Sequence, residues 1–283
     1  MKVLNFGSLN IDLVYRVRDF VRPGETIPAL SFARFAGGKG LNQSLAAARA
    51  GARVVHAGAV GDDGGFLLDI LRDSGVDCSA VTVDPESPSG HAVIQVADSG
   101  ENSIVLFPGA NHRITPELVA RALSCAEAGD ILLLQNEISA MPEIMREAAA
   151  RRMRIFINPA PMTPAVAEYP LELVDTLIVN ETEAEALAGC RLPEKVNVLK
   201  TLGARGAVYN DTIHVRRTGW SRWWTPPRRG IRSSATSSRG CCAATRCAPR
   251  WRRRPRPRRG ASGTRERRPR SPAAAIWKTD PPL

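Results

Sequence analysis

Short apolar runs alternate with amphipathic stretches along the first 215 residues of the chain. The apolar runs have the length of buried strands and lie at 3–9, 53–61, 130–137, 154–161, 175–181 and 196–203. The amphipathic stretches are rich in helix-forming residues and lie at 41–50, 65–75, 116–129, 141–152 and 182–189. Because strands alternate with helices, the pattern predicts an α/β fold, in which helices cover both faces of a parallel sheet.

Two stretches depart from this rhythm and predict a second, smaller sheet. Residues 12–35 and 90–107 alternate apolar and polar positions, as half-buried strands do. Each stretch is divided by a turn, at residues 23–24 in the first and 98–100 in the second. We expect a small sheet attached to an α/β body, in which ligands bind beyond the carboxyl ends of the parallel strands.

The composition of the chain changes near residue 216. Residues 216–283 contain 20 Lys and Arg against 2 Asp and Glu, a balance of +18. Because the whole chain carries +11, residues 1–215 carry −7, and the basic character belongs to the tail alone. The tail holds all five tryptophans but only three residues of the Val, Ile and Leu type. This aliphatic surface is too small to offset the entropy of ordering, so we expect residues 216–283 to be disordered.

The cysteines and the N-terminal sequence bear on the cellular compartment. None of the six cysteines has a partner at the spacing of a zinc site, and no disulfide framework is predicted. The start, MKVLNFGSLNID, has no long apolar run, and no window reaches the ~18 apolar residues of a membrane span. We therefore expect a cytoplasmic protein in a reducing compartment, without a membrane segment.

A glycine-rich segment, FAGGKGLNQ at 35–43, precedes one of the predicted helices. Backbone amides at the N-terminus of a helix suit an anion or sugar hydroxyls. Lys39 is followed by Gly40 rather than by Ser or Thr, so the segment is not a P-loop. Taken alone, it is better explained as a tight turn without a ligand.

Two further segments place polar side chains at the ends of predicted strands. GSLNID at 7–12 puts Asn10 and Asp12 where an amide and a carboxylate suit sugar hydroxyls. QNE at 135–137 puts Glu137 directly after another apolar strand. Taken singly, the first segment is better explained by local hydrogen bonds and the second by a solvated charge.

Two segments nearer the end of the α/β region suit a metal and a phosphate. VNETEAEAL at 179–187 carries Asn180 and Glu183 at a strand end, where carboxylates organise Mg²⁺ beside phosphates, usually through waters. The alternative is that these residues merely cap a helix. TLGARG at 201–206 is a glycine-containing turn suited to the close approach of a nucleotide, or simply a β-turn.

Together, the order and spacing of these segments resemble the ribokinase branch of the ribokinase/PfkB sugar-kinase family. The segments that carry the resemblance are GSLNID, PGET (23–26), GGKGLNQ, GAVGDD (58–63), GENSIVLFPGAN (100–111), NPAP (158–161), NETEAE (180–185) and TLGARG. The resemblance covers residues 1 to about 215. It implies a Rossmann-type domain whose small sheet is a lid that also forms a homodimer contact.

The resemblance also implies an activity and its site. The activity is phosphorylation of a sugar hydroxymethyl group by ATP and Mg²⁺, with D-ribose as the first candidate and a monovalent cation as a further ligand. The implied sugar-binding residues are Asn10, Asp12, Gly37, Gly38, Lys39, Asn42 and Glu137. The implied nucleotide-binding residues are Asn180 and the turn Thr201, Leu202, Gly203, Ala204, Arg205 and Gly206. Glu183 would help to organise the metal.

The sequence departs from the family pattern in two places. Only five residues separate Cys190 from Val196, where the family has a further helix. The family also has an Ala-Ala-Gly-Asp or Gly-Ala-Gly-Asp turn, whose amides form an anion hole and whose aspartate is the base. No such motif follows TLGARG, and the only later acids are Glu266 and Asp280. We therefore assign no catalytic residue and expect little or no phosphoryl transfer.

A shift of the reading frame by one base restores this turn. Because tryptophan has a single codon, Trp223, Trp224 and Thr225 read TGG TGG ACN. Read one base earlier, Trp224 becomes valine and Thr225 becomes aspartate. With third bases free elsewhere, the reading through Cys247 is VVDTTAAGDTFIGYFLAGLLRGDAL. We infer that residues from about 216 onward are a frameshifted translation of a sugar-kinase C-terminus.

Two other functions stay open. A chain that binds sugar but does not transfer phosphate would be a pseudokinase. The basic tail could instead be an arm that binds nucleic acid, with arginines on phosphates and tryptophans stacked on bases. A selected nucleic-acid arm has no reason to hide an AAGD helix in another frame, so the frame reading makes a nucleic-acid partner the weaker hypothesis.

Overall fold

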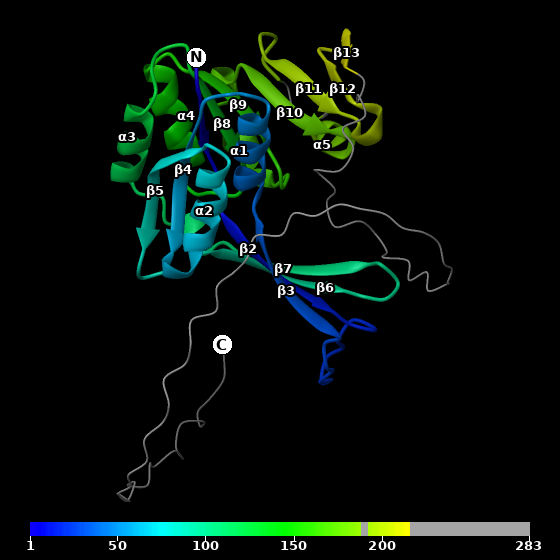
Figure 1. Ribbon diagram of the computed structural model, residues 1–283. Coiled ribbons are helices and arrows are strands. Elements are labelled where there is room, and N and C mark those ends of the chain that lie inside the picture. The colour runs from blue at the N-terminus through cyan, green and yellow to red at the C-terminus, as the bar shows by residue number, and fades with distance from the viewer. Residues whose placement is uncertain (188–191, 216–283) are drawn as a thin grey trace, which may run out of the picture. The chain divides into compact units, whose positions relative to one another are not determined.

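The computed structural model describes residues 1–187 and 192–215, which form a large sheet with helices on both faces and a second, small sheet (Figure 1). The predicted α/β architecture is therefore confirmed. The tail at 216–283 and Cys190 lie outside the described residues, so the expectations for them stay predictions.

Nine strands form the large sheet in the described part of the chain. In order from one edge, they are β13 (Ile213–Val215), β12 (Ala207–Tyr209), β11 (Asn197–Thr201), β10 (Thr176–Asn180), β9 (Arg154–Asn158), β8 (Ile131–Gln135), β1 (Val3–Phe6), β4 (Val54–Gly61) and β5 (Asp77–Asp84). All neighbours from β11 to β5 pair in parallel, whereas β12 and β13 add an antiparallel hairpin at one edge. The carboxyl ends of the central strands therefore share one edge of the sheet.

Five α-helices cover this sheet in the described residues. They are α1 (Lys39–Arg49), α2 (Gly65–Asp73), α3 (Pro116–Ser124), α4 (Met141–Ala150) and α5 (Glu181–Leu187). Helices α1 and α2 pack on one face, with their own buried cluster around Leu41, Leu67 and Leu71. Helices α3, α4 and α5 pack on the other face, over a larger cluster that includes Phe6 and Leu134.

The two faces of the central strands differ in chemistry because side chains alternate along each strand. Phe6, Leu134, Ile157 and Leu177 lie in register on four neighbouring strands and are fully buried under the α3–α4 layer. On the opposite face Asn5 lies in register with His56, and both are fully buried beneath α1. The α1 face therefore carries a polar layer inside the protein, which must be satisfied by hydrogen bonds.

The small sheet, called the lid below, consists of four strands. In order they are β3 (Ser31–Gly37), β2 (Asn10–Arg16), β6 (Gly90–Val96) and β7 (Asn102–Phe107). It extends from the side of the body where β4 and β5 end (Figure 1). The predicted stretches 12–35 and 90–107 supply its strands, but β2 begins earlier, at Asn10, and β3 ends later, at Gly37.

Two expectations about strands are corrected. The strand expected at 3–9 ends at Phe6, and Asn10 and Asp12 belong to the first lid strand rather than to the end of β1. The backbone leaves the large sheet at Gly7, because the first turn of α1 packs directly against Gly7 and Ser8. Strand β5 was not expected, since its sequence DCSAVTVD mixes polar and apolar residues at a sheet edge.

His56 is held neutral within the polar layer. Asn5 Nδ2 donates to Ser44 Oγ at 2.7 Å, so the Ser44 hydroxyl is free to donate to His56 Nδ1, also at 2.7 Å. With this direction the imidazole proton would lie on Nε2. Nε2 has the Gly7 carbonyl nearby but no partner that meets hydrogen-bond geometry within the described residues. Burial lowers the pKa of His56 from its usual 6.5 to about 4, and the Gly7 carbonyl opposes this shift only in part.

His56 should therefore make stability fall in mild acid. The unfolded chain takes up a proton near pH 6.5, whereas folded His56 does so only near pH 4, so stability is lost as the pH falls through this window. We expect this residue to account for a loss of about 3 kcal/mol between pH 7 and pH 4. Urea unfolding of the native chain and of His56→Gln across this range measures it. Parallel pH profiles for the two proteins would contradict the assignment.

Candidate active site

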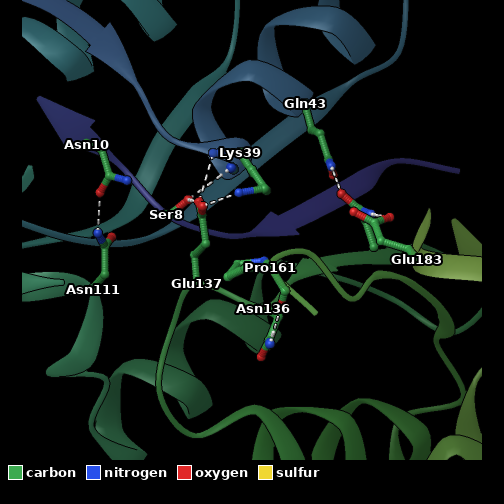
Figure 2. Close-up of polar contacts among 11 residues, drawn as sticks. Ser8, Asn10, Lys39, Gln43, Asn111, Asn136, Glu137, Pro161 and Glu183 are labelled. Carbon is green, nitrogen blue, oxygen red and sulfur yellow. Dashed lines mark hydrogen bonds and ion pairs between the residues drawn. The ribbon is translucent and has the colours of Figure 1, made fainter. Parts of the chain in front are cut away.

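Three of the predicted sugar-binding residues, Asn10, Lys39 and Glu137, lie where β1, β8 and the lid strand β2 meet the first turn of α1 (Figure 2). Glu137 follows β8, Lys39 begins α1, and Asn10 begins β2. These segments are about 30 to 130 residues apart in sequence, and the parallel topology brings them to one edge.

The carboxylate of Glu137 is the most tightly held group of this cluster. Ser8 Oγ donates to its Oε2 at 2.5 Å, and the Lys39 backbone N–H donates to the same oxygen at 3.0 Å. Lys39 Nζ pairs with Oε1 at 2.5 Å. Only 7% of the Glu137 side chain is exposed, against 39% of Lys39. Such a buried carboxylate is tolerated because charged and neutral donors surround it.

The second residue of α1, Gly40, lies so close to the body that no side chain fits there. A Cβ on Gly40 would lie 2.3 Å from the backbone nitrogen of Ser8 and 2.5 Å from the carbonyl carbon of Gly7. Gly38, which precedes the helix, has φ of +96°, a conformation that favours glycine. The glycines of this segment thus let the helix begin against the end of β1, and Gly40 N–H donates to Ser8 Oγ at 3.2 Å.

Asp12 lies on the lid strand β2 with its carboxylate over Gly37. A Cβ on Gly37 would lie 2.3 Å from one carboxylate oxygen, so a side chain there would displace the carboxylate. Burial, and then the negative charge of Glu137, raise the pKa of Asp12 above its usual 3.8. Two carboxylates that lie close together and are partly desolvated are typical of a binding or catalytic site.

The remaining predicted sugar residues have different surroundings. Asn10 is buried, and its Oδ1 accepts from Asn111 Nδ2 at 2.7 Å (Figure 2). Asn111 also accepts from the backbone N–H of Leu9 at 3.0 Å, so it fixes the start of β2. Asn42 lies on the first turn of α1 and is exposed.

The predicted nucleotide-side residues come together at the ends of β10 and β11. Asn180 is in register with Thr201, and the turn 201–206 continues from there. Asn180 Oδ1 accepts from Glu183 N–H at 2.8 Å, and Glu183 Oε2 accepts from Asn180 N–H at 3.0 Å. This reciprocal pair is a capping box, so the helix-capping alternative describes part of what these residues do.

The donor set on this side suits a metal that is held largely by water and phosphate. Among residues 1–187 and 192–215, no three His, Cys, Asp or Glu side chains cluster as metal ligands. Glu183 uses Oε2 in the capping box, which leaves Oε1 of the same carboxylate for a water-mediated contact. Mg²⁺ commonly keeps several waters and takes one or two carboxylates together with substrate phosphates, so Glu183 fits that role.

Comparison with known proteins assigns the family. The model of the pfkB family of carbohydrate kinases matches residues 1–221. This chain belongs to that family. As a member of that family, it is a sugar kinase by ancestry. The match ends close to residue 216, where the composition changes.

Individual pfkB-family relatives are ribokinases. The ribokinase of Haemophilus influenzae is 34% identical over 235 residues, which cover 76% of this chain and 74% of that protein. The structure of ribokinase from Cryptococcus neoformans var. grubii in complex with ADP is similar, with a TM-score of 0.62 and 33% identity over 74% of this chain and 75% of that one. Arabidopsis thaliana ribokinase complexed with ribose and ATP has a TM-score of 0.62 and 28% identity, with 74% of each chain covered.

Sequence reasoning did not single out several residues that shape this candidate site. Ser8 and Asn111 lie inside quoted motifs, yet their roles depend on partners more than 100 residues away. Gln43 and Asn158 likewise contact each other across 115 residues. A polar residue within a glycine-rich or strand-end motif was the available signal, but it does not reveal the partner.

None of the helices in the described part of the chain has the length and apolar character needed to cross a bilayer.

The seating of α1 can be tested with two glycine substitutions at helix starts. We expect Gly40→Ala to lower the free energy of unfolding by about 1–3 kcal/mol or more, because the new Cβ would overlap backbone atoms of Gly7 and Ser8. The matched control is Gly65→Ala at the start of α2, where nothing lies within 4 Å, and it should be neutral or stabilising by up to ~1 kcal/mol. Equal stabilities of the two variants in urea unfolding would refute this packing.

Proposed function

We propose that this fold binds a pentose and serves ATP-dependent phosphorylation of its hydroxymethyl group, with D-ribose converted to ribose 5-phosphate as the first candidate. The observation that carries the proposal is the pair of desolvated carboxylates, Asp12 and Glu137, held beside the glycine-rich start of α1. Carboxylates accept hydrogen bonds from sugar hydroxyls, and the amides before α1 can donate to hydroxyl oxygens. The Arabidopsis relative was solved with ribose and ATP, which supports this choice.

Each side of the site has a distinct role in this proposal. The sugar would be held by Asn10, Asp12, Gly37, Gly38, Lys39, Asn42 and Glu137. The nucleotide would lie against Asn180 and the turn from Thr201 to Gly206, with Glu183 organising Mg²⁺ through water. Bound Mg²⁺ would neutralise phosphate charge during transfer. A monovalent cation is a further proposed ligand, and the cytoplasm is the proposed location.

The base and the anion hole are proposed to lie in another reading frame. Because the AAGD turn is recovered one base away from the codons for residues 228–231, we propose that a frameshift near residue 216 separates the chain from its catalytic element. The family match that ends at residue 221 supports this reading. The chain as its sequence stands would then bind sugar and transfer little or no phosphate.

We also propose that the lid forms a homodimer contact. Residues in register on neighbouring strands point to the same face, so Phe35, Leu106 and Asp12 share one face of the lid. Phe35 is 54% exposed and Leu106 is 51% exposed. The opposite face of the lid also exposes apolar side chains, Phe32, Val105 and Phe107. Exposed apolar side chains of this kind are typical of a surface that another chain covers.

The sugar proposal predicts binding without turnover. We expect the purified chain to bind D-ribose in titration calorimetry, and to consume MgATP at no more than a background rate, because no base accepts the hydroxyl proton. A second chain, expressed from a gene with the frame restored before codon 216, should turn over ribose and ATP. Absence of ribose binding in both chains would refute the sugar site, whereas turnover by the first chain would refute the missing base.

The dimer proposal predicts that substitutions on one face of the lid dissociate the dimer, whereas substitutions on the other face do not. We expect Leu106→Glu to shift the chain towards monomer in sedimentation velocity, because it places a charge in the apolar contact. Val105→Glu is the matched control on the opposite face, where the native side chain is 67% exposed. Dissociation by Val105→Glu alone would assign the contact to the other face, and a monomeric native chain would refute the dimer.

A further inference from the structure

Four side-chain amides form a continuous chain between helix α1 and the large sheet. Gln135 Nε2 donates to Asn5 Oδ1 at 2.9 Å and to Gln43 Oε1 at 2.7 Å. Gln43 Nε2 donates to Asn158 Oδ1 at 3.1 Å. Asn5 and Gln135 are fully buried, so these bonds are shielded from water. We call these four residues the amide chain.

The direction of every hydrogen bond in the amide chain is fixed from its two ends. At one end Asn5 Nδ2 donates to the Gly40 carbonyl at 2.7 Å, which leaves Asn5 Oδ1 as the acceptor. At the other end Asn158 Nδ2 donates to the Ile178 carbonyl at 2.8 Å, which leaves Asn158 Oδ1 as the acceptor. A backbone carbonyl can only accept, so no amide of the chain can turn over without losing a bond. Followed from either end, the bonds require Gln135 Nε2 to be the donor, to Asn5 Oδ1 on one side and to Gln43 Oε1 on the other.

The ends of the amide chain lie on the two sides of the site. Gly40 is adjacent to Lys39, whose backbone and side chain hold Glu137. Asn158 Nδ2 also reaches Glu183 Oε2 at 3.5 Å, at the limit of a hydrogen bond. Gln43 is the one member on α1, and it donates to Asn158 Oδ1. Figure 2 shows its side chain pointing towards Glu183.

We propose that Gln43 is a positioning residue that fixes the Glu183 carboxylate relative to the start of α1. This role rests on the proposed function, in which Glu183 organises Mg²⁺ and Lys39 lies in the sugar site. With Gln43 in place, Asn158 is oriented with its amide nitrogen towards Glu183. Without Gln43, nothing on α1 holds Asn158 Oδ1. Glu183 then keeps the backbone N–H of Asn180 but loses its link to α1. Partners of this kind around a metal-organising carboxylate set metal affinity without contacting the metal.

The test is metal binding by the full chain with Mn²⁺ and ADP as the probe. We expect Gln43→Met to raise the dissociation constant of Mn²⁺ in the presence of ADP by about 10-fold, followed by water proton relaxation. The dissociation constant of ribose should stay within about twofold, since Lys39, Glu137 and Asp12 are unchanged. Gln95→Met, the same change on the lid strand β6, should leave both constants unchanged. Gln43→Asn keeps an amide but is one methylene too short for both partners, and it serves if the methionine variant does not fold.

The outcomes separate this role from the proposed function. Native Mn²⁺ affinity in a folded Gln43 variant would overturn the positioning role alone. Equal weakening of Mn²⁺ and ribose binding would also overturn it, because a general loss of structure moves both. Failure of the native chain to bind Mn²⁺ and ADP would overturn both the proposed nucleotide site and the role of Gln43. Failure to bind ribose alone would overturn the proposed sugar. In that case the Mn²⁺ dissociation constants of the variants would still support or refute the role of Gln43.

Discussion

The contact between the start of α1 and the end of β1 is the constraint on which the site depends. Gly40 lies against Gly7 and Ser8 with no space for a Cβ, so the backbone of the first turn of α1 contacts the end of β1 directly. This approach brings the Lys39 amide to Glu137, the Gly40 amide to Ser8 and the Gly40 carbonyl to Asn5. The absence of a side chain at Gly40 therefore allows both the contacts that hold the Glu137 carboxylate and those of the polar layer beneath α1.

The two carboxylates of the site are stabilised to different extents. Glu137 is surrounded by three donors, two of them from Lys39. The pKa of Asp12 is raised because the side chain is partly buried and because the negative charge of Glu137 repels its ionised form. The charge of Glu137 is thus satisfied by protein donors, whereas the described residues offer Asp12 no comparable set. A polyhydroxylated ligand can supply donors to Asp12, which would favour hydroxyl groups at this position.

Hydrophobic periodicity was sufficient to predict the parallel sheet, its helices and the lid, because those features depend on local alternation. Strand β5 escaped prediction since an edge strand carries polar residues, and the end of β1 was placed too late because a tertiary contact at Gly7 ends it. The pfkB-type motifs contain the residues proposed for both halves of the site. They did not reveal Ser8, Asn111, Gln43 or Asn158, whose partners are set by the packing of distant segments.

The place of Asn10 and Asp12 on a lid strand has a thermodynamic consequence. Their counterparts Lys39 and Glu137 belong to the body, so a sugar that touches both sets is a cross-link between two sheets. The residues that recognise the ligand are then the same residues that tie down the lid. Ligand affinity and lid order are linked functions, and any change that loosens the lid in the free protein must be repaid from the binding free energy of the sugar.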